Sequence, residues 1–138
     1  MSLDVELVHQ GYGALNEAFE SGDFQPFIEF IEQRCDPRIV LKPAGVFPES
    51  AEMRGHEGMM RLLTAQAEAF ETLRIEPHEV VEVRDRIVVS VSFGGRARHT
   101  GLDVDVSVAH VWTVRNHKAL RLDMYASKTD ALEAVEKS

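Results

Sequence analysis

A histidine within a run of valines is the side chain of this sequence best suited to acid–base chemistry. Side chains alternate along residues 103–114, which places on one face of a strand Val104, Val106, Val108, His110, Trp112 and Val114. His110 therefore points to the apolar side, next to Trp112. A neutral imidazole there acts as a general base if its pKa lies near the working pH. The alternative is a core histidine that is hydrogen-bonded to a backbone carbonyl.

Other patterns that suggest chemistry are incomplete. His56-Glu57 begins like a zinc-protease helix, but Met60 stands where the second histidine is needed. Gly11-Tyr12-Gly13 lacks the preceding strand and the third glycine of a dinucleotide site. Cys35 is expected to be a buried apolar side chain. The six histidines share no ligand spacing, so the sequence predicts no metal ion and no other cofactor.

Length and charge limit the class of protein. The 138 residues, 15.5 kDa in mass, predict a single domain over residues 1–138, and a hydrophobic content of 44% is enough for its core. The net charge of −8 is spread along the chain. We therefore expect no nucleic acid and no membrane as partner, because an anionic partner requires a basic stripe. A single cysteine and the lack of a secretory signal or a long apolar run predict a cytoplasmic protein.

Apolar residues at spacings of three and four predict helices in the first half of the chain and at its end. Two such stripes, over residues 5–19 and 24–31, are separated by Ser21-Gly22-Asp23, in which Gly22 suits a left-handed helix stop. A third stripe covers residues 55–70, after a predicted loop over residues 44–54. Ser127 begins a capping box that opens a last helix.

The period changes to two at Leu73, which predicts strands. Breaks at residues 84–85, 99–101 and 115–117 divide this stretch into four strands of an antiparallel meander, and residues 39–43 form a short strand earlier in the chain. Helices followed by a long antiparallel sheet indicate an α+β fold, in which three helices must cover one face of a curved sheet. Such a layer can leave a pocket between the helices and the sheet.

Short motifs punctuate this order of elements, namely Ser21-Gly-Asp23, Pro43-Ala-Gly45, Arg54-Gly-His-Glu-Gly58 and Lys118-Ala-Leu-Arg-Leu-Asp-Met-Tyr125. From Asp4 to Glu136 the chain resembles the SnoaL-like branch of the nuclear-transport-factor-two-like superfamily, which includes polyketide cyclases and ketosteroid isomerase. The resemblance implies a cone-shaped barrel of a curved antiparallel sheet, with three to four helices packed on its concave face. The superfamily also holds modules that do no chemistry, so the fold does not choose an activity.

The ketosteroid isomerase pattern departs from this sequence at two positions. Lys42 stands where that pattern has the aspartate base, and Leu15 stands where it has the oxyanion tyrosine. Steroid isomerisation is therefore not expected. The family pattern implies that Lys42 points into the cone, where its ammonium would stabilise developing negative charge or its amine would act as base or nucleophile. The alternative is a lysine stem at the mouth with its charge in water.

In the polyketide cyclase pattern, a histidine on the penultimate strand works with an aspartate on the last strand. His110 is similar to that histidine, Met124 stands at the position of the aspartate, and Asp123 is one residue away. One step along a strand turns a side chain to the other face unless a bulge intervenes. Either Asp123 or Met124 therefore faces the pocket, depending on the register of the last strand.

These observations predict a pocket protein that binds a lipophilic small molecule. The pocket-lining residues are expected to be Tyr12, Leu15, Trp112 and Met124. The candidate catalytic residues, for cyclisation, isomerisation or dehydration by acid–base chemistry, are His110, Lys42 and Asp123. The alternative is a noncatalytic ligand-binding or dimerisation module of the same fold. Family habit predicts a homodimer, and so does the second face of the sheet, which mixes charged residues with Ala109, Val111 and Tyr125.

Overall fold

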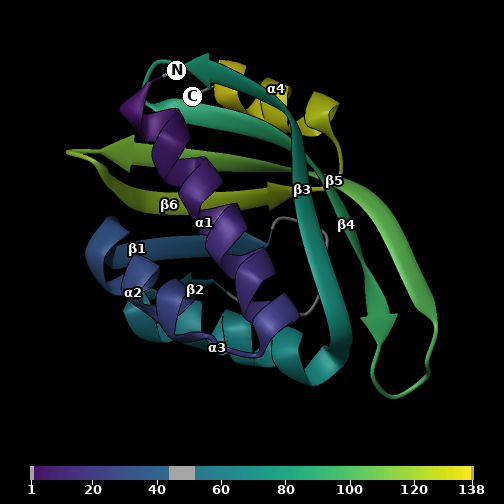
Figure 1. The fold of residues 1–138 in the computed structure, drawn as a ribbon. Helices are drawn as coiled ribbons and strands as arrows, with labels where there is room; N and C mark the ends of the chain where they lie inside the picture. Colours follow the sequence, from purple (N-terminus) through teal and green to yellow (C-terminus); the bar gives the residue numbers. More distant parts are fainter. Residues whose placement is uncertain (1, 44–51, 138) are drawn as a thin grey trace.

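The computed structural model describes residues 2–43 and 52–137, which form an α+β fold (Figure 1). The helices of this part of the chain are α1 (Leu3–Ser21), α2 (Gln25–Arg34), α3 (Gly55–Ala69) and α4 (Lys128–Glu136). Its strands are β1 (Cys35–Pro43), β2 (Met53–Arg54), β3 (Phe70–Val83), β4 (Arg86–Ala97), β5 (Asp103–Arg115) and β6 (Lys118–Tyr125). Most of the loop expected over residues 44–54 lies outside the described residues, and its last two residues form β2.

The strands form one sheet in the order β2-β1-β6-β5-β4-β3. The expected meander of β3 to β6 is present, with every neighbouring pair antiparallel. The sheet as a whole is mixed, because β1 pairs with β6 in parallel. It is also open, with β2 at one edge and β3 at the other. The turn between β5 and β6 places Asn116 and His117 at φ values of 52° and 62°, as a tight two-residue hairpin requires.

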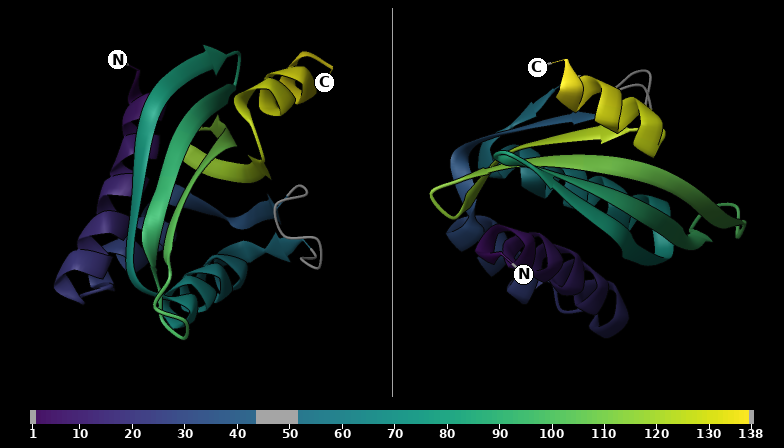
Figure 2. Two further views of the ribbon diagram at one scale, coloured as in Figure 1. Left: turned by 90° about the vertical axis from the view of Figure 1, so that its right-hand side faces the viewer. Right: turned by 90° about the horizontal axis from the view of Figure 1, so that it is seen from above.

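The helices lie on both faces of the sheet (Figure 2). Helices α1, α2 and α3 pack against the concave face, as expected for the cone. Helix α4 packs on the opposite face, where Ala131 and Val135 cover Val88, Ala109 and Val111 in a small second core. The larger core lies between the other three helices and the concave face. Because α4 buries Ala109 and Val111, these two residues no longer support the homodimer that the second face of the sheet suggested.

One contact ends α1, and another fixes it over the sheet. Gly22 ends the helix at a φ of 79°, and its N–H donates to the carbonyl of Ala18, as the Ser-Gly-Asp sequence predicts. The Asn16 side chain bonds to both backbone groups of Ile75 on β3, donating to the carbonyl and accepting from the N–H, each at 2.8 Å. This contact ties α1 to an edge strand and sets the position of Tyr12, one helical turn earlier.

Candidate ligand-binding site

The concave face of the sheet and helices α1 to α3 enclose a cavity of about 440 Å³. Most of its lining consists of aliphatic, aromatic and methionine side chains. They include Leu15, Phe27, Phe30, Leu41, Met53, Met59, Leu63, Val108, Leu122 and Met124. Polar atoms come from the side chains of Tyr12, Gln66, His110 and Trp112. The described lining contains no Asp, Glu, Lys, Arg or Cys side chain. A site of this kind suits an apolar molecule that a few polar contacts orient.

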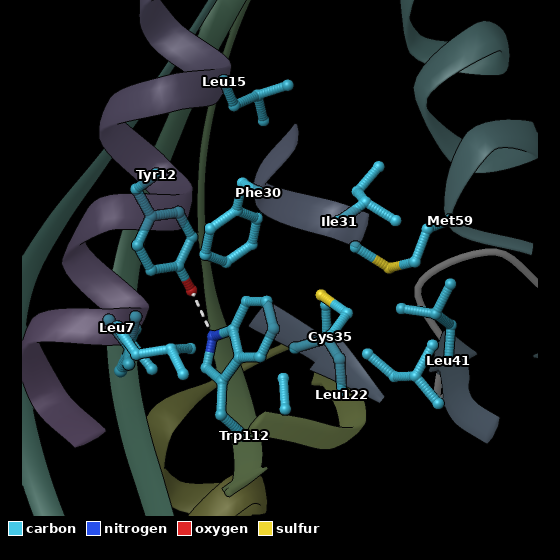
Figure 3. Packing of buried hydrophobic residues seen from close by; sticks show 14 of the residues in the cluster. Leu7, Tyr12, Leu15, Phe30, Ile31, Cys35, Leu41, Met59, Trp112 and Leu122 are labelled. Atoms are coloured by element: carbon cyan, nitrogen blue, oxygen red, sulfur yellow. Dashed lines mark hydrogen bonds between the residues drawn. The ribbon is translucent and has the colours of Figure 1, made fainter. Parts of the chain in front are cut away.

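Tyr12, His110 and Trp112 form a hydrogen-bonded group in the cavity wall. His110 and Trp112 are two residues apart on β5, so both point to the concave face, and α1 places Tyr12 over them. The Tyr12 hydroxyl oxygen lies 2.7 Å from Nδ1 of His110 and 2.9 Å from Nε1 of Trp112; Figure 3 shows the second of these bonds. The Tyr12 ring stacks on His110 at an interplanar angle of 19° and meets Trp112 edge-on at 86°.

Burial keeps this group uncharged. The three side chains are between 5% and 9% exposed. Desolvation lowers the pKa of His110 to about 4, since the imidazolium form loses its hydration. Desolvation also raises the pKa of Tyr12 far above its usual value, although the hydrogen bond from Trp112 opposes this shift. At neutral pH the cavity therefore presents a neutral imidazole and a neutral phenol.

A comparison with protein families identifies the fold at the level of sequence. The model of the SnoaL-like domain matches residues 12–122, which include every residue of the hydrogen-bonded group. The chain belongs to the SnoaL-like domain family. No curated protein matches this SnoaL-like domain at a significant level.

Solved structures share the fold of this SnoaL-like domain at low sequence identity. An NTF2-like protein of unknown function from Burkholderia pseudomallei is 20% identical with a TM-score of 0.74, and the match covers 98% of each chain. TerC, crystallised with polyporic acid, is 23% identical with a TM-score of 0.72 over 98% of this chain and 99% of its own. A protein from a Jannaschia species, provisionally described as a SnoaL-like polyketide cyclase, is 15% identical with a TM-score of 0.73 over 99% and 93%.

The structure places the four expected lining residues, Tyr12, Leu15, Trp112 and Met124, in the cavity wall of the SnoaL-like domain. His110 lies there too, and it pairs with Met124 across β5 and β6. The register of the last strand is therefore the one in which Met124 faces the cavity and Asp123 faces away. The irregularity between β5 and β6 lies nearer the turn, at Thr113 and Val114, so it does not change the alternation around Asp123.

Lys42 and Asp123 lie on the outer face of the sheet. The expectation that Lys42 points into the cone is therefore wrong, and of the two alternatives for the last strand Asp123 is the residue that faces away. They pair with each other across β1 and β6, while the neighbours of Lys42 on β1, Leu41 and Pro43, line the cavity. Lys42 is exposed. The carboxylate of Asp123 accepts two hydrogen bonds from Arg121, at 2.8 and 3.0 Å. The register of β1 on β6, with Leu41 opposite Leu122 and Pro43 opposite Met124, thus places Lys42 on the same outer face as Asp123.

Sequence reasoning missed two parts of the site. The rings of Phe27 and Phe30 come from α2. Phe27 belonged to the predicted helix stripe, but a stripe does not distinguish a solid core from a cavity wall. The contact of Tyr12 with His110 and Trp112 joins residues about 100 positions apart. The available signal was chemical, because a buried tyrosine hydroxyl and a buried indole N–H each need a partner.

Other reactive side chains of the SnoaL-like domain have structural partners. His56 donates from Nε2 to the carbonyl of Cys35 at 2.8 Å and so attaches the start of α3 to β1. Burial raises the pKa of the Cys35 thiol to about 12, which removes its nucleophilicity. Residues 2–43 and 52–137 contain no cluster of three His, Cys, Asp or Glu side chains that could hold a metal ion. Within the same ranges, no helix has both the length and the apolar character to cross a membrane.

Proposed function

We propose that this SnoaL-like domain binds a lipophilic small molecule in the cavity under α1 to α3, with His110 as a polar contact. The observation that carries the proposal is the cavity itself, about 440 Å³ in volume with no charged side chain in its described lining. Ligand sites in proteins fall in the range of about 300–1,000 Å³. Burial of apolar ligand surface against this lining supplies roughly 25 cal/mol per Å² as the driving force.

Solved relatives support the assignment of a small-molecule site. TerC was crystallised with polyporic acid. A protein with a ketosteroid isomerase-like fold from Catenulispora acidiphila was solved in complex with trimethylamine; it is 14% identical to this chain with a TM-score of 0.69, over 88% of this chain and 85% of its own. Both are far from this chain in sequence, so the chemical nature of its ligand has to be argued from its own lining.

Acid–base catalysis on the bound molecule is a second candidate, because His110 lies in the cavity wall. The geometry supports it less than binding. The described lining offers no carboxylate and no lysine, and a histidine with a pKa of about 4 is a weak base at neutral pH. A turnover assay decides between the two. Catalysis predicts a turnover whose kcat falls in His110→Ala, while a binding role predicts no turnover and a loss of ligand affinity alone in that variant.

Binding of the uncharged fluorophore N-phenyl-1-naphthylamine tests the proposal. Val108 and Ser107 are neighbours on β5, but Val108 lines the cavity and Ser107 is exposed on the outer face. We expect Val108→Trp to fill the cavity and weaken binding at least about tenfold, while Ser107→Trp binds like the wild type. Circular dichroism checks that both variants fold. Equal affinity in a folded Val108→Trp variant would place the fluorophore elsewhere and refute the site.

A further inference from the structure

We infer that Tyr12 and Trp112 hold His110 in the tautomer that carries its hydrogen on Nε2, so that the cavity selects uncharged molecules bearing a hydrogen-bond acceptor such as a ketone oxygen. The inference rests on the proposed function, because it names the ligand class of the same cavity. Tyr12 and Trp112 act in it as positioning residues.

The direction of the hydrogen bonds begins at Trp112. An indole N–H can only donate, so the Tyr12 oxygen must be the acceptor of the 2.9 Å bond from Nε1. That bond uses one lone pair of the hydroxyl and leaves its own hydrogen free to donate. Trp112 therefore makes the Tyr12 oxygen an acceptor on its side, and the Tyr12 hydrogen must bond elsewhere.

The hydroxyl hydrogen of Tyr12 has one partner among the described residues. Nδ1 of His110 lies 2.7 Å from the hydroxyl oxygen. If Nδ1 carried a hydrogen, two donors would point at one oxygen and the tyrosine hydrogen would be left without an acceptor. Tyr12 is only 5% exposed, so water does not replace that acceptor. An unsatisfied buried donor reduces the population of such a state by roughly ten- to a hundredfold.

The hydrogen of the imidazole is consequently on Nε2. Within residues 2–43 and 52–137 no side chain or backbone group bonds to Nε2, and His110 lines the cavity. Nε2–H is therefore available to a ligand as a donor, and it has no lone pair with which to accept. A ligand oxygen with a lone pair satisfies it, whereas a pure hydrocarbon leaves it unpaired.

The described lining also argues against charged ligands. A carboxylate or an ammonium that enters the cavity loses its hydration, and no described lining side chain carries the opposite charge. Neutral carbonyl compounds avoid this cost and still accept the hydrogen bond from Nε2. The geometry thus favours lipophilic ketones, quinones and related carbonyl compounds over acids, charged amines and hydrocarbons of the same size.

The tautomer can be measured without any ligand. Long-range ¹H–¹⁵N NMR spectra of the labelled protein at pH 7 show which nitrogen of His110 is protonated, with His110→Phe used to assign the signals. We expect Nε2 protonated in the wild type and in Tyr125→Phe, a control for the other tyrosine, which lies on the outer face. In Tyr12→Phe we expect a measurable population of the Nδ1–H form. Protonation of Nδ1 in the wild type, or an unchanged spectrum in Tyr12→Phe, would overturn the inference.

A matched pair of neutral probes then tests selectivity. In 2-acetylnaphthalene the carbonyl oxygen replaces the terminal CH₂ of 2-isopropenylnaphthalene, so the two have nearly the same shape and only the ketone carries an acceptor. We expect the wild type and Tyr125→Phe to bind the ketone about fivefold more tightly. His110→Phe should lose this preference and favour the alkene, because the ketone oxygen then leaves water without gaining a donor. Equal affinity of the wild type for both probes would refute the inference but leave the proposed function intact. Failure of both probes to bind would refute the proposed function and, with it, the ligand class.

Discussion

The glycines at positions 11 and 13 of α1 provide a matched test of how closely this helix packs on the cavity wall. Both lie inside one helix, so alanine at either position gains the same helix propensity, about 1 kcal/mol. A Cβ atom at position 13 would meet nothing within 4 Å. A Cβ atom at position 11 would lie 2.7 Å from Cζ of Phe30 and 3.0 Å from its Cε2. The two substitutions therefore differ in one contact.

The size of the difference follows from that contact. Carbon atoms in van der Waals contact are about 3.5–4.0 Å apart, so the Phe30 ring must retreat by about 1 Å. The ring is 3% exposed and stacks on Phe27, which resists the movement. Overpacking of this kind costs about 1–3 kcal/mol. We expect Gly13→Ala to raise the free energy of unfolding by about 1 kcal/mol, and Gly11→Ala to range from neutral to about 2 kcal/mol less stable than wild type.

Urea denaturation at pH 7 measures both free energies of unfolding, and an unchanged slope with urea shows that the variants remain comparable. Thermal melts should separate the two variants by about 3–4 °C for each kcal/mol. Phe30 also lines the cavity, so Gly11→Ala should weaken binding of N-phenyl-1-naphthylamine while Gly13→Ala does not. Equal stabilisation by the two alanines would show that Phe30 does not press on α1, and would refute this reasoning.

Three other predictions follow from single contacts. Burial lowers the pKa of His110 from 6.5 to about 4, so between these pH values the unfolded chain binds a proton that the folded chain does not. The free energy of unfolding should therefore fall by about 3 kcal/mol as the pH drops from 6.5 towards 4, and urea titrations should show a smaller fall in His110→Phe. Arg98 donates to the carbonyls of Ala67 and Phe70 at the end of α3, so Arg98→Ala should lower the free energy of unfolding by about 1 kcal/mol in a urea titration. The control Arg96→Ala loses one exposed ion pair and should change this free energy by less than about 0.5 kcal/mol. Equal losses in the two variants would contradict this role for Arg98. Lys42→Ala should leave the affinity for N-phenyl-1-naphthylamine unchanged in a fluorescence titration, because Lys42 lies outside the cavity, and a weaker affinity would return it to the site.

The sequence predicted those parts of the fold that depend on local pattern. The change of period after α3 located the four long strands, and the breaks at residues 84–85 and 115–117 are turns in which Arg84, Asn116 and His117 adopt positive φ. The pairing of β1 with β6 is not local. Nothing in residues 35–43 indicates whether that strand joins the meander in parallel or antiparallel, because alternation looks the same in both.

The site was predictable where it depended on one strand and not where it depended on two elements. The alternation of β5 placed His110 and Trp112 on the apolar face. The side on which Lys42 lies depends on how β1 pairs, and the state of His110 depends on a tyrosine about 100 residues away in α1. Neither relation leaves a periodic trace in the chain, so each had to come from the three-dimensional structure.

The position of α4 has a consequence for the order in which the fold opens. Val88 and Val111 are buried beneath α4, and on the other side of the same strands Val89 and Trp112 are buried beneath α1 to α3. The middle of β4 and β5 is therefore covered on both sides, whereas α3 buries only the face that it turns towards the cavity. Amide hydrogen exchange should be slowest in β4 and β5 and faster in α3. The part of the cavity wall that α3 forms should therefore open locally while the centre of the sheet stays intact.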